Sequence, residues 1–188
     1  MRNDILNYLQ GELRHRCEQP SNRFGIGLYG HIEAVVKNGA LLAERYGADK
    51  EIVMIVAWLH DIASATDYSL YQDHHIHGAE MARDILLQWN YETERIEWVQ
   101  RCIRNHRGSV SLDQESVEEV CVADADAISH FDSLPSLLYL AYRERGMDFE
   151  EGRNFVKDKL ERSFQKLSPR SRELYENRYR QIMDILNG

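Results

Sequence analysis

The stretch IVMIVAWLHDIA, residues 52–63, decides the fold of this chain. Every side chain from residue 52 to residue 59 is apolar, so a helix formed by this segment has no polar face and must run through the middle of the protein. The segment ends in His60 and Asp61, an imidazole beside a carboxylate. Ionisable groups at the edge of a core need a strongly interacting partner, because their transfer out of water is unfavourable. A divalent metal ion is such a partner.

Other histidines and aspartates stand at helix ends and in loops where solubility does not require them. They are His31, the cluster from His74 to His77, His106, and the pair Asp124 and Asp126. A lone His-Asp step is common by chance, so the neighbouring candidates are what favour a metal site at His60 and Asp61.

Composition narrows the class of protein. A chain of 188 residues fits one domain, with or without a helical extension. The net charge of −8 argues against broad electrostatic binding to nucleic acid or anionic lipid. The three cysteines, Cys17, Cys102 and Cys121, are too widely spaced for a disulfide framework and indicate a reducing, cytoplasmic setting. No apolar run approaches the ~20 residues of a membrane span, so no membrane association is expected.

The apolar pattern predicts an all-α protein. Only three prolines interrupt the chain, and apolar residues recur at helical rather than strand spacing. Gly47 and Asp49 provide a left-handed helix end and the cap of the central helix, and Ser168 with Pro169 opens the last helix. The expected helices cover residues 3–17, 29–46, 52–59, 77–88, 93–105, 116–131, 137–143, 148–166 and 168–186. Residues 64–77 are expected to form a polar, irregular loop of the kind that carries function.

The expected helix at 116–131 contains two aspartates in VCVADADAI. Its apolar stripe consists of Val117, Val120, Cys121 and Ile128. A step of about 100° per residue places Asp124 within that stripe and Asp126 on another face. One carboxylate therefore packs against buried side chains, and spacing alone does not decide which one faces a site.

In chain order, the set His31, His60-Asp61 and an aspartate near 126 resembles the HD-domain metal-dependent phosphohydrolase superfamily. The segments that carry the resemblance are GHIEAVVKNGALLAERYG, VAWLHDIA, HHIHGAEMARDIL, CIRNHR and VADADAI. The tail, KLERSFQKLSPRSRELYENRYRQIMDIL, is similar to that of small bacterial HD hydrolases. The resemblance implies a multi-helix bundle with one HD domain over residues 1–188, comprising a catalytic core at about 24–131 and a C-terminal helical extension at about 132–188.

The resemblance also implies a metal site. The ligands of one divalent ion would be His31, His60, Asp61 and Asp126. Asp126 is preferred because the family's ligand is the second acid of D-x-D, followed two positions later by a large apolar residue, here Ile128. Two imidazoles and two carboxylates suit Mn, Fe, Ni, Co or Zn.

A two-metal branch of the family uses further histidines to hold a second ion bridged by Asp61. His74 and His106 match those positions, either as ligands of that second metal or as phosphate contacts. His75 and His77 are equally near in sequence, so which of the three histidines in HHIH faces the site stays open.

The implied activity is metal-dependent phosphohydrolysis of a small phosphorylated metabolite, with a nucleotide expected, through a metal-activated water and with Asp61 as the catalytic residue. Arg23 and Arg107 are the expected phosphate-binding residues. No nucleic acid polymer is expected as a partner, and a homodimer is left open. Many relatives have Arg or Lys where this chain has Ala127, and some have an acidic residue where it has Ser64. The substrate of any one subfamily therefore cannot be assigned to this chain. The competing interpretations are a non-catalytic sensor of nucleotide or metal and a di-iron HD-type oxygenase.

Overall fold

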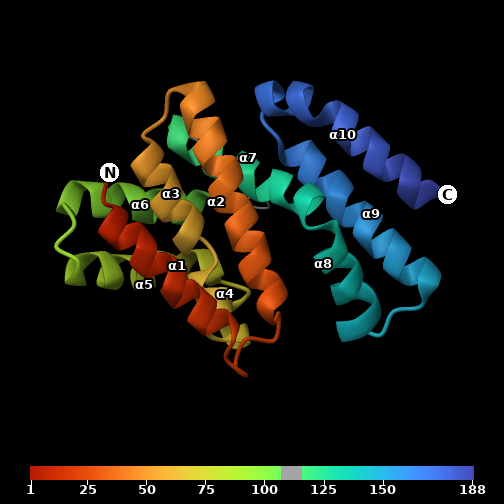
Figure 1. The fold of residues 1–188 in the computed structure, drawn as a ribbon, viewed down its shortest axis with the longest axis horizontal. Helices are drawn as coiled ribbons and strands as arrows, with labels where there is room; N and C mark the ends of the chain where they lie inside the picture. Colours follow the sequence, from red (N-terminus) through yellow and green to blue (C-terminus); the bar gives the residue numbers. More distant parts are fainter. Residues whose placement is uncertain (107–115) are drawn as a thin grey trace.

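The computed structural model describes residues 1–106 and 116–188, and these residues fold as an all-α bundle without a strand (Figure 1). The prediction of an all-α fold is confirmed. The α-helices are α1 (Asn3–Cys17), α2 (Ile26–Tyr46), α3 (Lys50–Leu59), α4 (Ile62–Thr66), α5 (His74–Gln88), α6 (Thr93–Asn105), α7 (Val117–Asp132), α8 (Leu134–Tyr139), α9 (Phe149–Lys166) and α10 (Pro169–Asn187). A 3-10 turn at Tyr68–Leu70 precedes α5, and a π-helical turn at Leu140–Glu144 extends α8.

Helix α3 forms the centre of the core, as its unbroken apolar sequence predicts. Its side chains Ile52, Val53, Ile55, Val56 and Leu59 are fully buried. The helix packs against α1, α2, α6 and α7. Asp49 starts it by accepting hydrogen bonds from the backbone N–H groups of residues 51 and 52. The His-Asp pair that follows is therefore anchored to the most buried element of the protein.

Helix α2 packs closely along α3 and α7. A Cβ at Gly39 would lie 3.0 Å from Cγ1 of Val53 and 3.7 Å from Cβ of Ala125, so a larger residue there would have to shift the Val53 side chain. Gly47 ends α2 at φ 75°, a left-handed cap. The close packing brings residues of α2 and α7 together at the end of α3.

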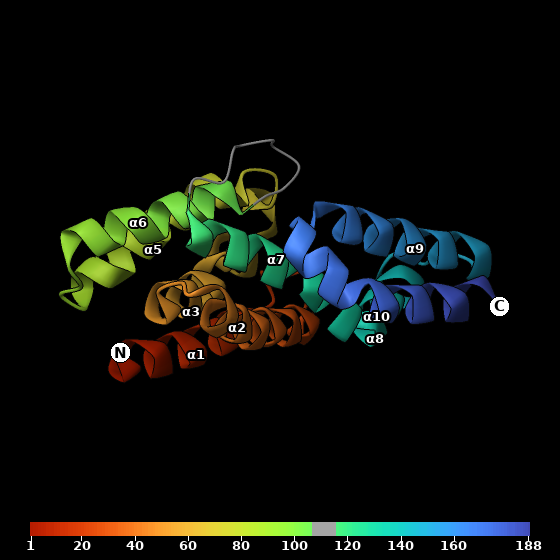
Figure 2. The ribbon, with the colours of Figure 1, turned by 90° about the horizontal axis from the view of Figure 1, so that it is seen from above.

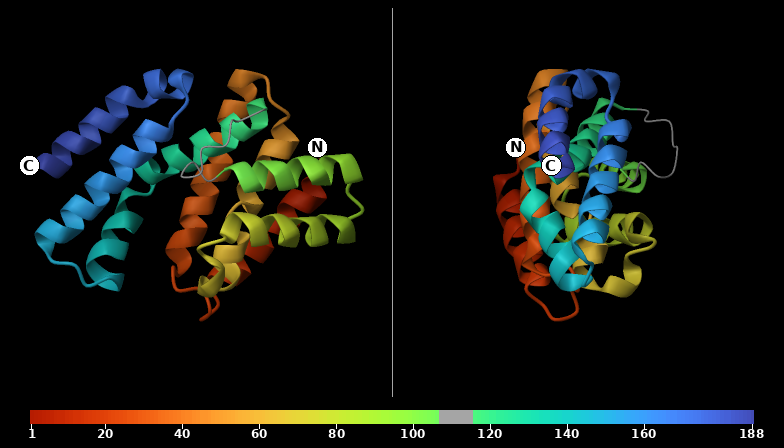
Figure 3. Two further views of the ribbon diagram at one scale, coloured as in Figure 1. Left: turned by 180° about the vertical axis from the view of Figure 1, so that it is seen from behind. Right: turned by 90° about the vertical axis from the view of Figure 1, so that its right-hand side faces the viewer.

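Helix α7 lies between two groups of helices. In Figure 2, α5 and α6 lie side by side at one end, whereas α8, α9 and α10 lie at the other. Seen from behind in Figure 3, α7 runs from the first group toward the second, and it contacts α2, α3, α6, α9 and α10. Helix α7 thus connects the two groups of helices.

Capping residues define the later helices as expected. The Ser116 hydroxyl accepts a hydrogen bond from the N–H of residue 119, and the Ser168 hydroxyl accepts one from the N–H of residue 171. Asp148 and Glu151 form a reciprocal capping box at the start of α9. These short-range polar signals agree with the observed starts of α7, α9 and α10.

The prediction of an irregular loop at residues 64–77 was wrong in part. Helix α4 occupies residues 62–66 because its apolar and small side chains are buried in the core, and α5 starts at His74, three residues before the predicted start. Helix α2 starts at Ile26 rather than Tyr29, and α8 starts at Leu134 with Pro135 in its first turn, where no backbone N–H is needed. Among the described residues, the helices include none that is long and apolar enough to cross a membrane.

Candidate metal centre

Two groups of nitrogen and oxygen donors lie at the end of α3. The first group contains His31, His60 and Asp126, whose ligand atoms all lie within 4.8 Å of one another. Nε2 of His31 is 3.3 Å from Oδ1 of Asp126. These residues come from α2, the end of α3 and α7, so the first group exists only because the three helices pack together.

The second group contains Asp61, His74 and His106, again with all ligand atoms within 4.8 Å. Nε2 of His74 is 3.4 Å from Oδ1 of Asp61 and 3.2 Å from Nε2 of His106. His74 is the first residue of α5 and His106 is the residue that ends α6. The second group therefore joins the end of α3 to the α5–α6 pair.

Asp61 connects the two groups. Its Oδ1 faces His74, whereas its Oδ2 lies 3.6 Å from Nε2 of His60 and 3.9 Å from Nε2 of His31. A carboxylate with one oxygen toward each of two donor groups has the geometry of a bridging ligand. Its position between α3 and α4 places it at the middle of the cluster.

Hydrogen bonds to the backbone orient three of the imidazoles. Nδ1 of His60 lies 2.7 Å from the carbonyl oxygen of residue 57, Nδ1 of His74 lies 2.8 Å from that of Tyr71, and Nδ1 of His106 lies 2.5 Å from that of residue 103. Since a carbonyl only accepts, each Nδ1 carries the proton, and the lone pair of each Nε2 is directed toward the cluster.

A serine orients the fourth imidazole. The hydroxyl of Ser129 donates to the backbone oxygen of Asp126 at 2.6 Å, so it accepts from Nδ1 of His31 at 2.9 Å. His31 therefore also presents an unprotonated Nε2. All four histidines offer the same atom to a shared region, which is the arrangement that metal-binding histidines need.

The donor set fits a bound cation. Nε2 of His60 is buried and has no hydrogen-bond partner among the described residues. Its nearest carboxylate oxygen, on Asp61, lies at 3.6 Å, beyond hydrogen-bond distance. A buried polar atom without a partner is costly, and a metal ion would provide the missing interaction.

The local electrostatics keep the donors in their metal-binding forms. Burial lowers the pKa of His60, and it lowers the pKa of His106 to about 4, so both imidazoles are neutral near neutral pH. Burial acts to raise the pKa of Asp61, but the surrounding histidines lower it to about 2. Burial likewise acts to raise the pKa of Asp126, but the neighbouring His31, His130 and His60 hold it well below its ordinary value. Neutral imidazoles and ionised carboxylates are the ligand forms of divalent metals.

The two aspartates of the D-x-D motif have different environments. Asp124 is 2% exposed and accepts hydrogen bonds from the backbone N–H and the hydroxyl of Ser168, at 2.8 and 2.5 Å. Burial raises its pKa. Asp124 thus holds the turn between α9 and α10, whereas Asp126 lies with the donor cluster.

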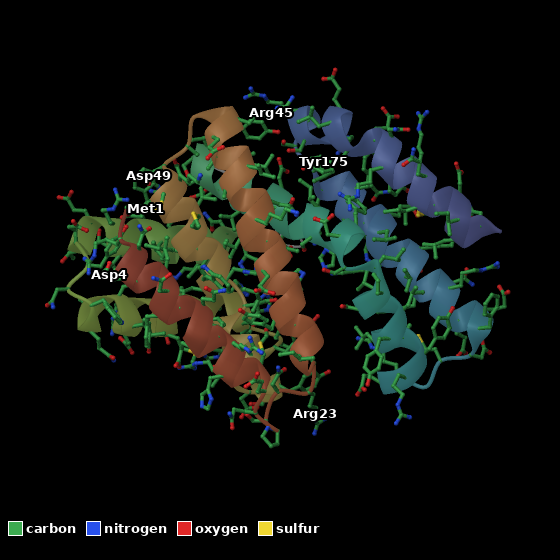
Figure 4. All side chains as sticks on the ribbon, in the orientation of Figure 1. Met1, Asp4, Arg23, Arg45, Asp49 and Tyr175 are labelled. Carbon is green, nitrogen blue, oxygen red and sulfur yellow. The ribbon has the colours of Figure 1, made fainter. Side chains whose placement is uncertain are left out.

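Of the remaining residues predicted from the sequence, those that the structure describes lie at different distances from the donor cluster. His74 lies in the second group, while His75 packs edge-on against its ring with centroids 5.8 Å apart. Arg23 lies at the periphery, on the loop between α1 and α2 (Figure 4), with its guanidinium carbon 5.2 Å from the centre of the Tyr68 ring. Arg107 lies outside the described residues.

Two residues beside the cluster do not belong to the predicted set. The His130 ring lies 5.1 Å from that of His31, and its Nδ1 is 3.2 Å from the hydroxyl of Ser163 on α9. Its position one helical turn after Asp126 is a signal that could have identified it. Lys159, also on α9, interacts electrostatically with Asp61 and Asp126, and no motif in the sequence points to it.

The sequence is similar to parts of known proteins. The chain is 27% identical over 161 residues to ribonuclease Y of Rubrobacter xylanophilus and 31% identical over 121 residues to ribonuclease Y of Clostridium novyi. These alignments span 79% and 64% of this chain, but only 28% and 21% of the respective relatives.

A crystal structure of a predicted HD superfamily hydrolase from an uncultured Thermotogales bacterium has the same fold, with a TM-score of 0.54, 24% sequence identity and 87% of each chain covered. The HD domain family matches residues 28–130, which is more than half of the chain and includes all six residues of the two donor groups. The chain therefore belongs to the HD-domain superfamily.

Proposed function

We propose that this protein is a metal-dependent phosphohydrolase that acts on a small phosphorylated metabolite, and that this metabolite is a nucleotide. The observation that carries the proposal is the position of Asp61, with one carboxylate oxygen toward each of two groups of nitrogen and oxygen donors. Such an arrangement suits hydrolysis of a phosphate ester, in which charge on several oxygens must be offset at once.

The proposed ligands of the first ion are His31, His60, Asp61 and Asp126. A second ion would share Asp61 and bind His74 and His106. The mixed nitrogen and oxygen set suits Mn, Fe, Ni, Co or Zn. A divalent ion bound there supplies a coordinated water of lowered pKa and positive charge opposite the phosphoryl oxygens.

The protein's own contribution is orientation. Backbone carbonyls and Ser129 hold the four imidazoles with Nε2 inward, so the donor atoms need little rearrangement. Since the pKa of Asp61 is lowered to about 2, this residue stays ionised and acts as an anionic ligand rather than as a proton acceptor. Its role in catalysis is thus to hold the reacting groups in place.

An aromatic cluster beside the second donor group supports a nucleotide as the substrate. The ring of Tyr71 is nearly parallel to that of His74, at 5.8 Å and 13°, and to that of Tyr68, at 5.9 Å and 5°. Phe24 packs against both tyrosines, and Arg23 lies over Tyr68. Tyr68 and Tyr71 remain 38% and 43% exposed. Exposed aromatic rings next to a phosphate-hydrolysing site favour stacking of a nucleobase.

The test combines elemental analysis of the purified protein with a phosphate-release screen in Mn, Ni, Co and Mg. Nucleotides, non-nucleotide phosphomonoesters and a short RNA oligonucleotide are compared as substrates. We expect bound transition metal, and turnover of nucleotides above that of the other classes. Asp61→Ala should lose both metal and activity, while Asp73→Ala, which removes an exposed carboxylate from the start of α5, should retain both. Unchanged activity in Asp61→Ala would contradict the proposal.

The competing functions give different results in the same experiment. A sensor would bind nucleotide without releasing phosphate. An oxygenase would contain iron and show turnover that depends on oxygen. Tyr71→Ala tests the nucleobase contact: KM for the nucleotide should rise about tenfold, corresponding to the 1–3 kcal/mol typical of base stacking, whereas KM for a non-nucleotide phosphomonoester should stay unchanged.

A further inference from the structure

Helix α9 brings a lysine to the donor cluster from outside the segment that matches the HD family. Lys159 lies on α9, well beyond residues 28–130. Its backbone oxygen accepts a hydrogen bond at 2.9 Å from the hydroxyl of Ser163, one turn later on the same face. Ser163 in turn contacts Nδ1 of His130, and the His130 ring lies 5.1 Å from that of His31. The helix face that carries Lys159 is therefore the face directed at the cluster.

The side chain of Lys159 is partly buried, and its surroundings have opposing effects on its pKa. Burial lowers the pKa of Lys159, while the carboxylates of Asp126 and Asp61 act to raise it. Yet Lys159 forms no hydrogen bond through its side chain and no ion pair with any described residue. A partly buried ammonium group without a direct protein partner is available to bind an anionic ligand.

The neighbouring groups indicate the charge of that ligand. Both carboxylates near Lys159 already interact with histidines of the donor groups. His130 adds no negative charge. An anion that reaches the donor cluster would therefore be the natural partner of the ammonium group, and lysine is well suited to bind phosphoryl oxygens as a point charge with three donors.

We propose that Lys159 binds the phosphoryl group of the substrate, so that helix α9 of the C-terminal extension completes the active site. This inference rests on the proposed function, since it uses the same cluster. Ser163 and His130 act as positioning residues that hold this face of α9 against α7. The extension is then a part of the substrate site rather than a support for the fold.

The experiment compares Lys159→Gln with wild type and with Lys157→Gln. Lys157 lies on the same helix, about 200° around its axis, so its substitution removes the same charge from a different face. Binding of inorganic phosphate to the manganese-loaded protein is measured by calorimetry, alongside KM, kcat and metal content. Phosphate affinity should fall at least tenfold and KM should rise by a similar factor in Lys159→Gln alone, with metal content unchanged. Lys159→Arg should recover part of the affinity.

A fourth variant separates ligand binding from a structural role. In the metal-free protein, Lys159→Met should leave the melting temperature unchanged or raise it, because it removes a cation that lacks a direct partner. A clear decrease would show that Lys159 stabilises the fold. Wild-type affinity and KM in Lys159→Gln would also overturn the inference. If no substrate releases phosphate but phosphate binding still depends on Lys159, the anion site stands and the proposed hydrolysis fails.

Discussion

The substitutions Asp124→Ala and Asp126→Ala should impair different properties, the first stability and the second metal binding, although only one residue separates the two aspartates. Asp124 is almost fully buried and accepts two hydrogen bonds from Ser168. Asp126 lies beside His31 in the donor cluster, with a side chain that is 19% exposed. We therefore expect Asp124 to be needed for stability and Asp126 to be needed for metal binding.

The magnitude for Asp124 follows from its two contacts. Hydrogen bonds to a charged group typically contribute about 1.5–3 kcal/mol each. Part of this contribution is offset by the burial that raises the pKa of Asp124. The free energy of unfolding should therefore fall by about 2–4 kcal/mol in Asp124→Ala, and the melting temperature by roughly 4–16 °C for a chain of this size. Asp124→Asn, which keeps one acceptor oxygen, should lose about half as much.

For Asp126→Ala, the free energy of unfolding of the metal-free protein should fall by less than for Asp124→Ala, since the contact of Asp126 with Nε2 of His31, at 3.3 Å, is longer than either hydrogen bond of Asp124. Unfolding in denaturant, followed by circular dichroism on chelator-treated samples, measures both values. Elemental analysis of untreated samples gives the metal content. Asp124→Ala should keep its metal and Asp126→Ala should lose it. If Asp124→Ala were as stable as wild type but lacked metal, the assignment of the two aspartates would be wrong.

Three further predictions follow from other parts of the molecule. Ser129→Ala removes the acceptor that orients His31, so metal affinity should fall about 10–100-fold in a competition titration while the circular dichroism spectrum stays unchanged. Gly152→Ala would force a Cβ into the ring of Tyr142, whose hydroxyl donates to the backbone oxygen of residue 149, and should lower the free energy of unfolding by about 1–3 kcal/mol in a denaturant titration. Burial raises the pKa of all three thiols from 9.0 to about 12, namely those of Cys17, Cys102 and Cys121. The unfolded chain therefore loses thiol protons at lower pH than the folded chain, and stability should decrease as the pH rises from 9 toward 12. Accordingly, a thiol reagent at about pH 8 should modify the cysteines only after denaturant is added.

Short-range patterns were sufficient to predict most of the secondary structure. The core helix α3 was predictable because eight consecutive apolar residues leave a helix no surface to expose to water. Asp49, Gly47 and Ser168 marked helix ends because a cap interacts with backbone groups within a few residues of itself. His60 and Asp61 were recognisable in the same way, as polar residues at the end of an apolar segment, whereas His31 and Asp126 were named from the family resemblance.

Contacts between distant segments account for what the patterns could not reveal. Periodicity describes the faces of one helix, but not which neighbour covers each face. Helical spacing did not distinguish Asp124 from Asp126, and the structure separates them because Ser168, 44 positions later, donates a hydrogen bond to Asp124. The early start of α5 at His74 reflects the packing of α4 against it. Helix α9 packs against α7, and this packing brings Lys159 close enough for Asp126 and Asp61 to affect its pKa. In the sequence, a lysine on an amphipathic helix has no local feature that distinguishes a ligand-binding role from a solvated one.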